Sequence, residues 1–181
     1  MAGANAPVDD GGAHHLVPGT PLPDLELPAT HGGTINLRTR AGTSVVYVYP
    51  WTGRPGLPDP PGWDDIPGAH GSTPETAGFR DLYLEFQGLG VEVFGLSGQS
   101  FEHQQELCER LSVPFTILSD ADGGFQRALR LPTFAAGPET YLNRLTLIVA
   151  DGAVRHAFYP VHPPETHAAE VLAWLRAAMP A

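Results

Sequence analysis

Apolar β-forming runs alternate with amphipathic, helix-like segments along most of the chain. Residues 44–50 are β-branched, aromatic and apolar, which predicts a buried strand, and helical spacing of apolar residues follows from about Thr76 to a stop at Gly88. Further strands are expected over residues 90–97, 113–120, 144–150 and 153–159, and further helices over residues 101–111, 125–131 and about 165–179. This order predicts an α/β domain with a mixed central sheet and helices on both of its faces.

Composition supports one soluble domain. The chain has 181 residues, 42% of them hydrophobic, and no apolar run approaches the 18 or so residues of a membrane-spanning helix. Residues 1–15 are rich in Gly, Ala and Asp and lack the basic start and apolar stretch of a signal peptide, so we expect a disordered tail before a single domain over residues 16–181. The cytoplasm is the default location for such a chain.

The charge and cysteine content exclude several classes of partner and site. A formal net charge of −10 argues against nucleic acid or an anionic membrane as a partner. The single cysteine excludes an internal disulfide and a thiolate metal cluster. The histidines at 14, 15, 156, 162 and 167 lack the spacing of a zinc site and are expected at the surface, so we predict neither a metal nor a cofactor.

Candidate chemistry lies at the entrance of the helix that follows the first predicted strand. Ser72 or Thr73 can serve as N-cap, Pro74 suits the first helical position, and Ser72 and Glu75 have the spacing of a capping box. Unpaired backbone N–H groups stabilise an anion at such an entrance, so a cysteine there would react as a thiolate. A serine hydroxyl does not ionise near neutral pH without a strong adjacent base, and on spacing alone Ser72 is only a helix cap.

The run over residues 71–81 resembles the Gly-Cys-Thr-x-Glu-x-x-Gly-Phe-Arg-Asp pattern of the peroxiredoxin Q group, also called bacterioferritin comigratory protein-like, with serine in place of the cysteine. The likeness extends to residues 18–27, to Tyr49-Pro50 and to residues 144–152, and it covers roughly residues 16–176 in the family's order. The resemblance implies a thioredoxin-like fold with a peroxiredoxin-type N-terminal extension. It also implies thiol-dependent reduction of hydrogen peroxide or organic hydroperoxides, with recycling by thioredoxin or a similar dithiol reductant.

The same resemblance assigns roles to three residues. Ser72 takes the peroxidatic position, so the chain as written is expected to have no appreciable turnover. Cys108 lies 36 residues later, which suits a resolving cysteine in the next helix, although a small core cysteine is the alternative. Arg144 is expected to stabilise the thiolate and align the peroxide, although an arginine before a buried strand can also be a solvated edge charge.

The chain departs from the family pattern just before Ser72. The positions three and seven before it hold Ala69 and Asp65, where peroxiredoxins have Thr and Pro. Pro50 and Thr52 are therefore the candidates for the family's proline and threonine, and with Gly71 they complete the expected substrate site. The Pro/Gly-rich residues 51–71 would then be a looped-out insertion, whose Trp63 and His70 either line the approach to Ser72 or anchor the loop to the core.

Alternatives from other functional classes stay open. Ser72 is either an engineered replacement of cysteine or the natural residue of an inactive thioredoxin-like binding or regulatory protein. A serine hydrolase ranks last, because Ser72 has no Gly-x-Ser-x-Gly elbow and no histidine that the sequence identifies as its base. We expect a monomer.

Overall fold

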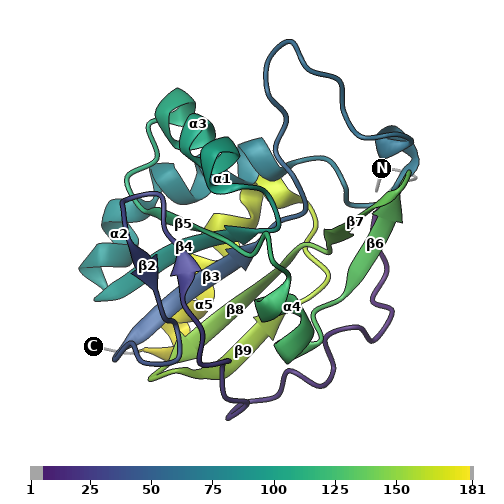
Figure 1. Cartoon of the computed structure of the whole chain (residues 1–181). Coiled ribbons are helices and arrows are strands. Elements are labelled where there is room, and N and C mark those ends of the chain that lie inside the picture. Colours follow the sequence, from purple (N-terminus) through teal and green to yellow (C-terminus); the bar gives the residue numbers. More distant parts are fainter. Residues whose placement is uncertain (1–5, 180–181) are drawn as a thin grey trace.

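The computed structural model describes residues 6–179 and is built around a five-stranded sheet of order β5-β4-β3-β8-β9 (Figure 1). β3 pairs in parallel with β4 and antiparallel with β8; β4 and β5 are parallel, and β8 and β9 are antiparallel. The strands are β3 (Thr43–Val48), β4 (Val91–Ser97), β5 (Thr116–Ser119), β8 (Leu145–Ala150) and β9 (Ala153–Phe158). The predicted mixed sheet is thus confirmed, and each expected strand lies within its predicted range except β3, which begins one residue earlier, at Thr43.

Alternation along β3 divides the core into two layers. Val45, Tyr47 and Tyr49 belong to one buried cluster, whereas Val46 and Val48 belong to the other. The first cluster includes side chains of four helices: α1 (Ser72–Asp81), α2 (Tyr83–Gly88), α3 (Phe101–Leu111) and α5 (His167–Ala178). These helices therefore cover one face of the sheet.

The second face is covered by α4 (Gly124–Leu129) and by the N-terminal segment with its short β1 (Leu27–Pro28) and β2 (Thr34–Ile35).

Residues 6–15 differ from the disordered tail that the sequence predicts. Ala13 is buried in the second cluster, and the Tyr159 hydroxyl donates to the Asp10 carboxylate over 2.8 Å. The composition of this segment does not predict an ordered structure, because the contacts that hold it are with residues far away in the chain.

Residues 51–71 form a long loop with a short 3₁₀ turn, η1 (Trp63–Asp65), which packs on a hairpin of β6 (Thr133–Ala136) and β7 (Glu139–Leu142). Trp63 is buried, and its ring centroid lies 5.0 Å from that of Tyr141 and 5.6 Å from that of Phe134. Figure 1 shows this loop and hairpin projecting beside the ends of the central strands. The sequence predicts the loop and one role of Trp63, but not the hairpin that receives it.

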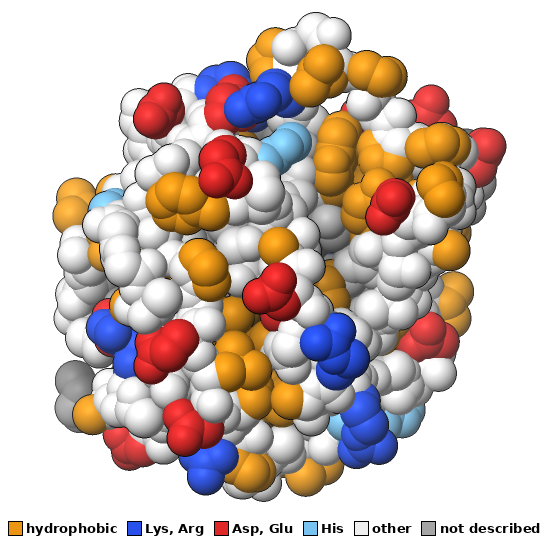
Figure 2. Space-filling view, in the orientation of Figure 1, with side chains coloured by type: hydrophobic (Ala, Val, Ile, Leu, Met, Phe, Trp, Pro, Cys, Tyr) orange, Lys and Arg blue, Asp and Glu red, His pale blue; other side chains and the backbone are white. Residues whose placement is uncertain are grey.

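The surface carries charges of both signs. Figure 2 shows acidic and basic side chains interspersed with apolar ones over the visible face. Among residues 6–179, no helix is both long and apolar enough to cross a bilayer.

Candidate active site

Ser72 is the first residue of α1, and Gly71 is its N-cap in the left-handed conformation, with φ 110°. The first helical hydrogen bond runs from the Glu75 N–H to the Gly71 carbonyl over 3.0 Å. No side chain caps the helix, so the capping box predicted from Ser72 and Glu75 is wrong, and Pro74 is the third helical residue instead of the first. The Ser72 side chain is 3% exposed, and its Oγ has no hydrogen-bond partner among the described residues.

Gly71 is required by both its conformation and its surroundings. A positive φ of this size disfavours any residue with a Cβ, and a Cβ on Gly71 would collide with the ring of Pro164. Pro164 lies in η2 (Pro164–Thr166), just before α5. The close approach of these two segments fixes where the chain enters α1 and therefore where Ser72 lies.

A buried ion pair joins β8 to α1 behind Ser72. Arg144 precedes β8 and is 5% exposed, and its Nη1 donates to Oε2 of the fully buried Glu75 over 3.3 Å. Its Nη2 donates to the carbonyls of Gly68, Ala69 and His70 over 3.2–3.3 Å. Arg144 thus binds the chain on both sides of Ser72 and is not the solvated edge charge of the alternative interpretation.

Several polar groups of this region are buried without a complete set of partners. Burial raises the pKa of Glu75 to about 7, although the nearby Arg144 guanidinium lowers it. Besides Ser72 Oγ, Glu75 Oε1 and Arg144 Nε are buried without a hydrogen-bond partner in the described chain. Buried polar atoms are satisfied in most proteins, so three such atoms around one helix entrance indicate a site for a polar ligand.

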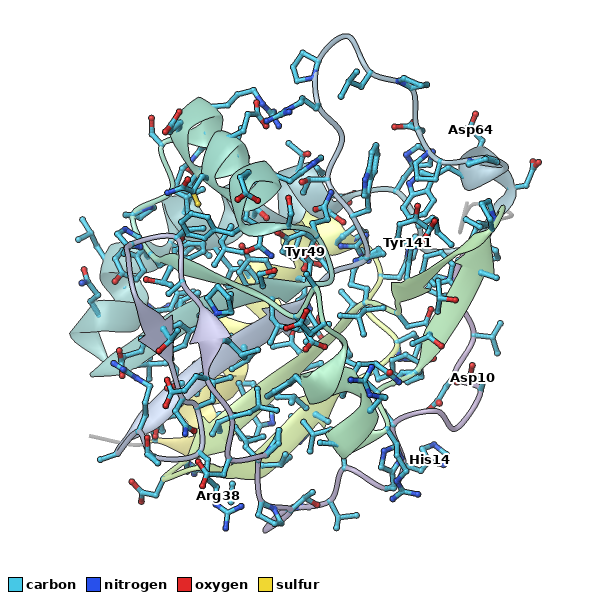
Figure 3. The ribbon with its side chains drawn as sticks, viewed as in Figure 1. Asp10, His14, Arg38, Tyr49, Asp64 and Tyr141 are labelled. Carbon is cyan, nitrogen blue, oxygen red and sulfur yellow. The ribbon has the colours of Figure 1, made fainter. Side chains whose placement is uncertain are left out.

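Ser72 lines a cavity of about 250 Å³, which we call the Ser72 cavity. The N-terminal turn of α1 forms one wall, and the 51–71 loop forms the other with Trp51, Asp59, Trp63 and His70. Trp63 therefore both anchors the loop and lines the approach to Ser72, which the sequence treats as alternatives. His70 Nε2 lies 2.6 Å from a carboxylate oxygen of Asp64, and Figure 3 shows Asp64 on the outer turn of the loop, with Tyr141 on the hairpin beneath it.

Thr52 and Pro50 are not among the residues that line the Ser72 cavity. Both the N–H and the hydroxyl of Thr52 donate to Gln99 Oε1, over 3.0 and 3.1 Å. The Thr52 carbonyl accepts from Gln99 Nε2 and lies 2.9 Å from His103 Nε2. Pro50 lines a different cavity, of about 340 Å³, whose wall also includes Gln99. Of the three expected substrate-binding residues, only Gly71 lines the Ser72 cavity.

Cys108 lies on α3, half-buried against the aromatic cluster of the helical face. Burial raises the pKa of its thiol, so the thiol is protonated near neutral pH. Cys108 is not part of the wall of the Ser72 cavity. Its role as a resolving residue stays a prediction that requires movement of the helices.

Sequence reasoning missed Glu75 as the partner of Arg144, because the helix-capping pattern offered a local role for it. It also placed His167 at the surface, whereas His167 is 1% exposed and its Nε2 lies 2.8 Å from Thr146 Oγ1. Burial lowers the pKa of His167, so the ring is neutral near pH 7. The apolar neighbours of His167 on α5 were the available signal, since its position falls on the buried face of that helix.

A family model described as Redoxin matches residues 17–172. The chain is 29% identical over 156 residues to a chloroplastic peroxiredoxin Q of Oryza sativa subsp. japonica, a match that covers 85% of this chain and 64% of that protein. It is also 29% identical over 158 residues to a peroxiredoxin bcp of Coxiella burnetii, covering 85% of this chain and 95% of that protein. The chain therefore spans somewhat less than two thirds of the rice relative and nearly all of the bacterial one.

Solved structures of Xanthomonas campestris peroxiredoxin Q share the fold. One superposes with a TM-score of 0.70 at 28% identity and covers 88% of this chain and 97% of that one. It is a mutant in which a cysteine is replaced by serine, and a second mutant of the same protein has another cysteine replaced by serine. Those two cysteines are 36 positions apart in that protein, the same separation as between Ser72 and Cys108 here.

Proposed function

The chain belongs to the Redoxin family and is similar to peroxiredoxin Q proteins, and from this premise we propose that it is a thiol-peroxidase scaffold with serine at the peroxidatic position. The observation that carries the proposal is the buried, unpartnered Oγ of Ser72 at the entrance of α1, backed by the Arg144–Glu75 pair. The proposed substrate is hydrogen peroxide or an organic hydroperoxide, and the proposed reductant is thioredoxin or a similar dithiol protein. We propose a cytoplasmic monomer.

The proposed chemistry requires a sulfur at position 72. A thiolate there would attack one peroxide oxygen and break the O–O bond, which gives a sulfenic acid and, after protonation, water or an alcohol. Arg144 would lower the pKa of the thiol at position 72 and stabilise the negative charge that grows on the leaving oxygen. The sulfenic acid would then condense with the Cys108 thiol to a disulfide and water, and the reductant would return both thiols. The 36-residue separation shared with the two mutated cysteines of the Xanthomonas protein supports Cys108 as the second sulfur.

Ser72 itself cannot perform the first step, because no base contacts its hydroxyl and a neutral hydroxyl is a poor nucleophile. The second candidate function, a non-catalytic binding protein, is favoured by one further observation. The Thr52 hydroxyl, which the family resemblance assigns to the peroxide, is committed to Gln99. In that case the Ser72 cavity binds a small polar ligand without turnover.

The test is to install the thiol. The parent chain should show no thioredoxin-coupled NADPH oxidation with hydrogen peroxide above a no-protein control, whereas Ser72→Cys should turn over at roughly 1 s⁻¹ or faster, within the usual range of enzymes. Thr73→Cys is the matched control, because it places a thiol in the same helical turn at a residue that is less buried. Its activity should stay close to that of the parent.

The sulfur partner is tested in the same background. One equivalent of peroxide should convert Ser72→Cys to an intramolecular disulfide with Cys108, seen as a loss of two hydrogens by mass spectrometry and as a linked peptide. Adding Cys108→Ser should preserve the first peroxide reaction and leave sulfenic acid in place of the disulfide. An inactive Ser72→Cys protein that is folded and reduced would overturn the peroxidase proposal and favour the binding protein.

A further inference from the structure

Three metal-ligating side chains of the 51–71 loop converge beside the Ser72 cavity. One ligating atom from each of Asp59, Asp64 and His70 can be chosen so that all three lie within 4.8 Å of one another. Asp59 and His70 are also part of the cavity wall. The three residues are 5 and 6 positions apart in an irregular loop, a spacing without the regularity of a zinc motif, so the sequence gives no sign of a site.

The backbone of this cluster is held by the protein interior. The His70 carbonyl accepts a hydrogen bond from the buried Arg144 over 3.2 Å, and Asp64 lies in η1, which the buried Trp63 ring anchors to the hairpin. The side chains remain open to solvent, with the His70 and Asp64 side chains 55% and 89% exposed. His70 and Asp64 thus present accessible ligand atoms from anchored backbone positions.

A second observation points to a ligand at the same place. The wall of the Ser72 cavity contains Asp59 and His70 of the loop together with Ser72 of α1. Ser72 is 3% exposed, and its buried hydroxyl has no hydrogen-bond partner in the described chain. A ligand in this cavity that carries an oxygen would have Ser72 Oγ as a hydrogen-bond partner and the loop side chains of Asp59 and His70 as neighbours.

The ligand set selects the kind of cation. One imidazole and two carboxylates suit a divalent transition metal such as Zn²⁺ or Mn²⁺, whereas Mg²⁺ and Ca²⁺ prefer oxygen ligands alone. Three protein ligands leave at least one position for water or substrate, as in catalytic zinc sites. With metal–ligand distances of about 2.1 Å, tetrahedral ligand atoms lie about 3.4 Å apart, so the three side chains need shifts of roughly 1 Å. Exposed side chains can make such shifts.

We propose that Asp59, Asp64 and His70 bind one divalent transition-metal ion at the mouth of the Ser72 cavity, with its open coordination position toward Ser72. The proposal goes beyond the peroxidase scaffold and does not depend on it, because it uses the chain with Ser72 in place and requires no sulfur chemistry. It also departs from the expectation of a metal-free protein that the sequence gives.

The test measures binding of the metal itself. The full chain, freed of metal by a chelator, is titrated with Zn²⁺ by calorimetry and with Mn²⁺ by NMR. We expect one equivalent of Zn²⁺ with a dissociation constant on the order of 10 μM or tighter. Mn²⁺ should broaden the amide signals of residues 59–73 before any others, because broadening falls steeply with distance from the ion.

Variants assign the ligands. His70→Ala and Asp59→Asn should each weaken Zn²⁺ binding by at least about tenfold, or about 1.4 kcal/mol. Asp65→Asn is the matched control, since it removes the same charge from the same turn at a residue outside the cluster, and it should change the affinity by less than about twofold. A double replacement of His14 and His15 by Ala should leave this equivalent in place and thereby exclude the adjacent pair as its source.

Two results would overturn the proposal. The first is no saturable binding below about 1 mM, which would leave the contact between His70 and Asp64 as a plain ion pair of the loop. The second is binding that His70→Ala and Asp59→Asn do not weaken although both variants keep the parent's circular dichroism and melting temperature. Either result would leave the peroxidase test with Ser72→Cys unaffected.

Discussion

The two ends of the 51–71 loop differ in how their polar groups are satisfied. At Thr52 the N–H, the carbonyl and the hydroxyl are all within hydrogen-bond distance of Gln99 or His103. At Ser72 the hydroxyl is as deeply buried, yet it has no partner in the described chain, and neither do Glu75 Oε1 and Arg144 Nε. The polar groups of Thr52 are thus all paired within the protein, as in a structural anchor, whereas the region of Ser72 keeps buried polar atoms available for a ligand.

This difference has an energetic basis. A buried polar atom without a partner costs about 1–3 kcal/mol, so three such atoms in one region lower the stability of the fold unless a ligand or water satisfies them. Buried charges add to this cost, because Glu75 and Arg144 lose their hydration, which their ion pair and the hydrogen bonds from Arg144 to three loop carbonyls replace only in part. Functional sites are places where such costs persist.

The largest effect should come from breaking the buried pair. Arg144→Ala leaves Glu75 buried without its cation and leaves three loop carbonyls without their donor, so it should lower the free energy of unfolding at pH 8 by about 3–5 kcal/mol. Urea denaturation followed by circular dichroism measures this loss. Adding Glu75→Gln to Arg144→Ala should restore part of the stability, because the uncompensated charge is gone.

The double mutant also separates charge from hydrogen bonding. The stability that Glu75→Gln does not restore belongs to the carbonyls of residues 68–70, which stay without Arg144 in both variants. A loss below about 1 kcal/mol in Arg144→Ala would show that the Arg144–Glu75 pair is hydrated like an exposed one, and the difference between the two ends of the loop would then disappear.

A smaller effect should follow pH. The pKa of Glu75 is about 7 in the folded protein and near 4.5 when the chain is unfolded, so the folded state binds the extra proton. Its contribution to stability is complete below about pH 4.5 and is lost as pH rises to about 7, by a total on the order of 3 kcal/mol. Asp120, whose pKa is raised mainly by burial, acts in the same direction, whereas His167, whose pKa is lowered mainly by burial, acts in the opposite one.

Subtraction isolates the Glu75 contribution. The unfolding free energies of the parent and of Glu75→Gln are measured from pH 4.5 to above pH 8. Their difference should change with pH over the range in which Glu75 titrates and should be constant at higher pH. Asp120 and His167 are present in both proteins, so their contributions cancel. Parallel pH profiles would show that Glu75 has an ordinary pKa and that the pair is not buried.

The sequence predicts the sheet better than the loop because local pattern and final burial coincide in the sheet. The 44–50 run is β-branched and aromatic, and it becomes β3, the central strand, with both faces covered. By contrast, Trp63 packs on Phe134 and Tyr141, which lie 71 and 78 positions later in the chain, and no local pattern signals that contact. Ser72 and Arg144 follow from motifs of a known family, whereas the commitment of Thr52 to Gln99 follows only from the folded positions of two loops.

The smallest effect should be at Thr52, and it decides whether that end of the loop is only structural. Thr52→Val keeps the shape of the side chain and removes the hydroxyl that donates to Gln99, so stability should fall by about 1 kcal/mol. In the Ser72→Cys background the rate of the first peroxide reaction should change by less than about twofold, because the hydroxyl is turned to Gln99 and Thr52 does not line the Ser72 cavity. Thr52→Ser is the matched control, since it keeps the hydroxyl and should retain most of the stability. The rate is measured by stopped-flow kinetics with hydrogen peroxide. If Thr52→Val slowed the reaction about tenfold or more while Thr52→Ser did not, Thr52 would be a peroxide ligand. The two ends of the loop would then form one site.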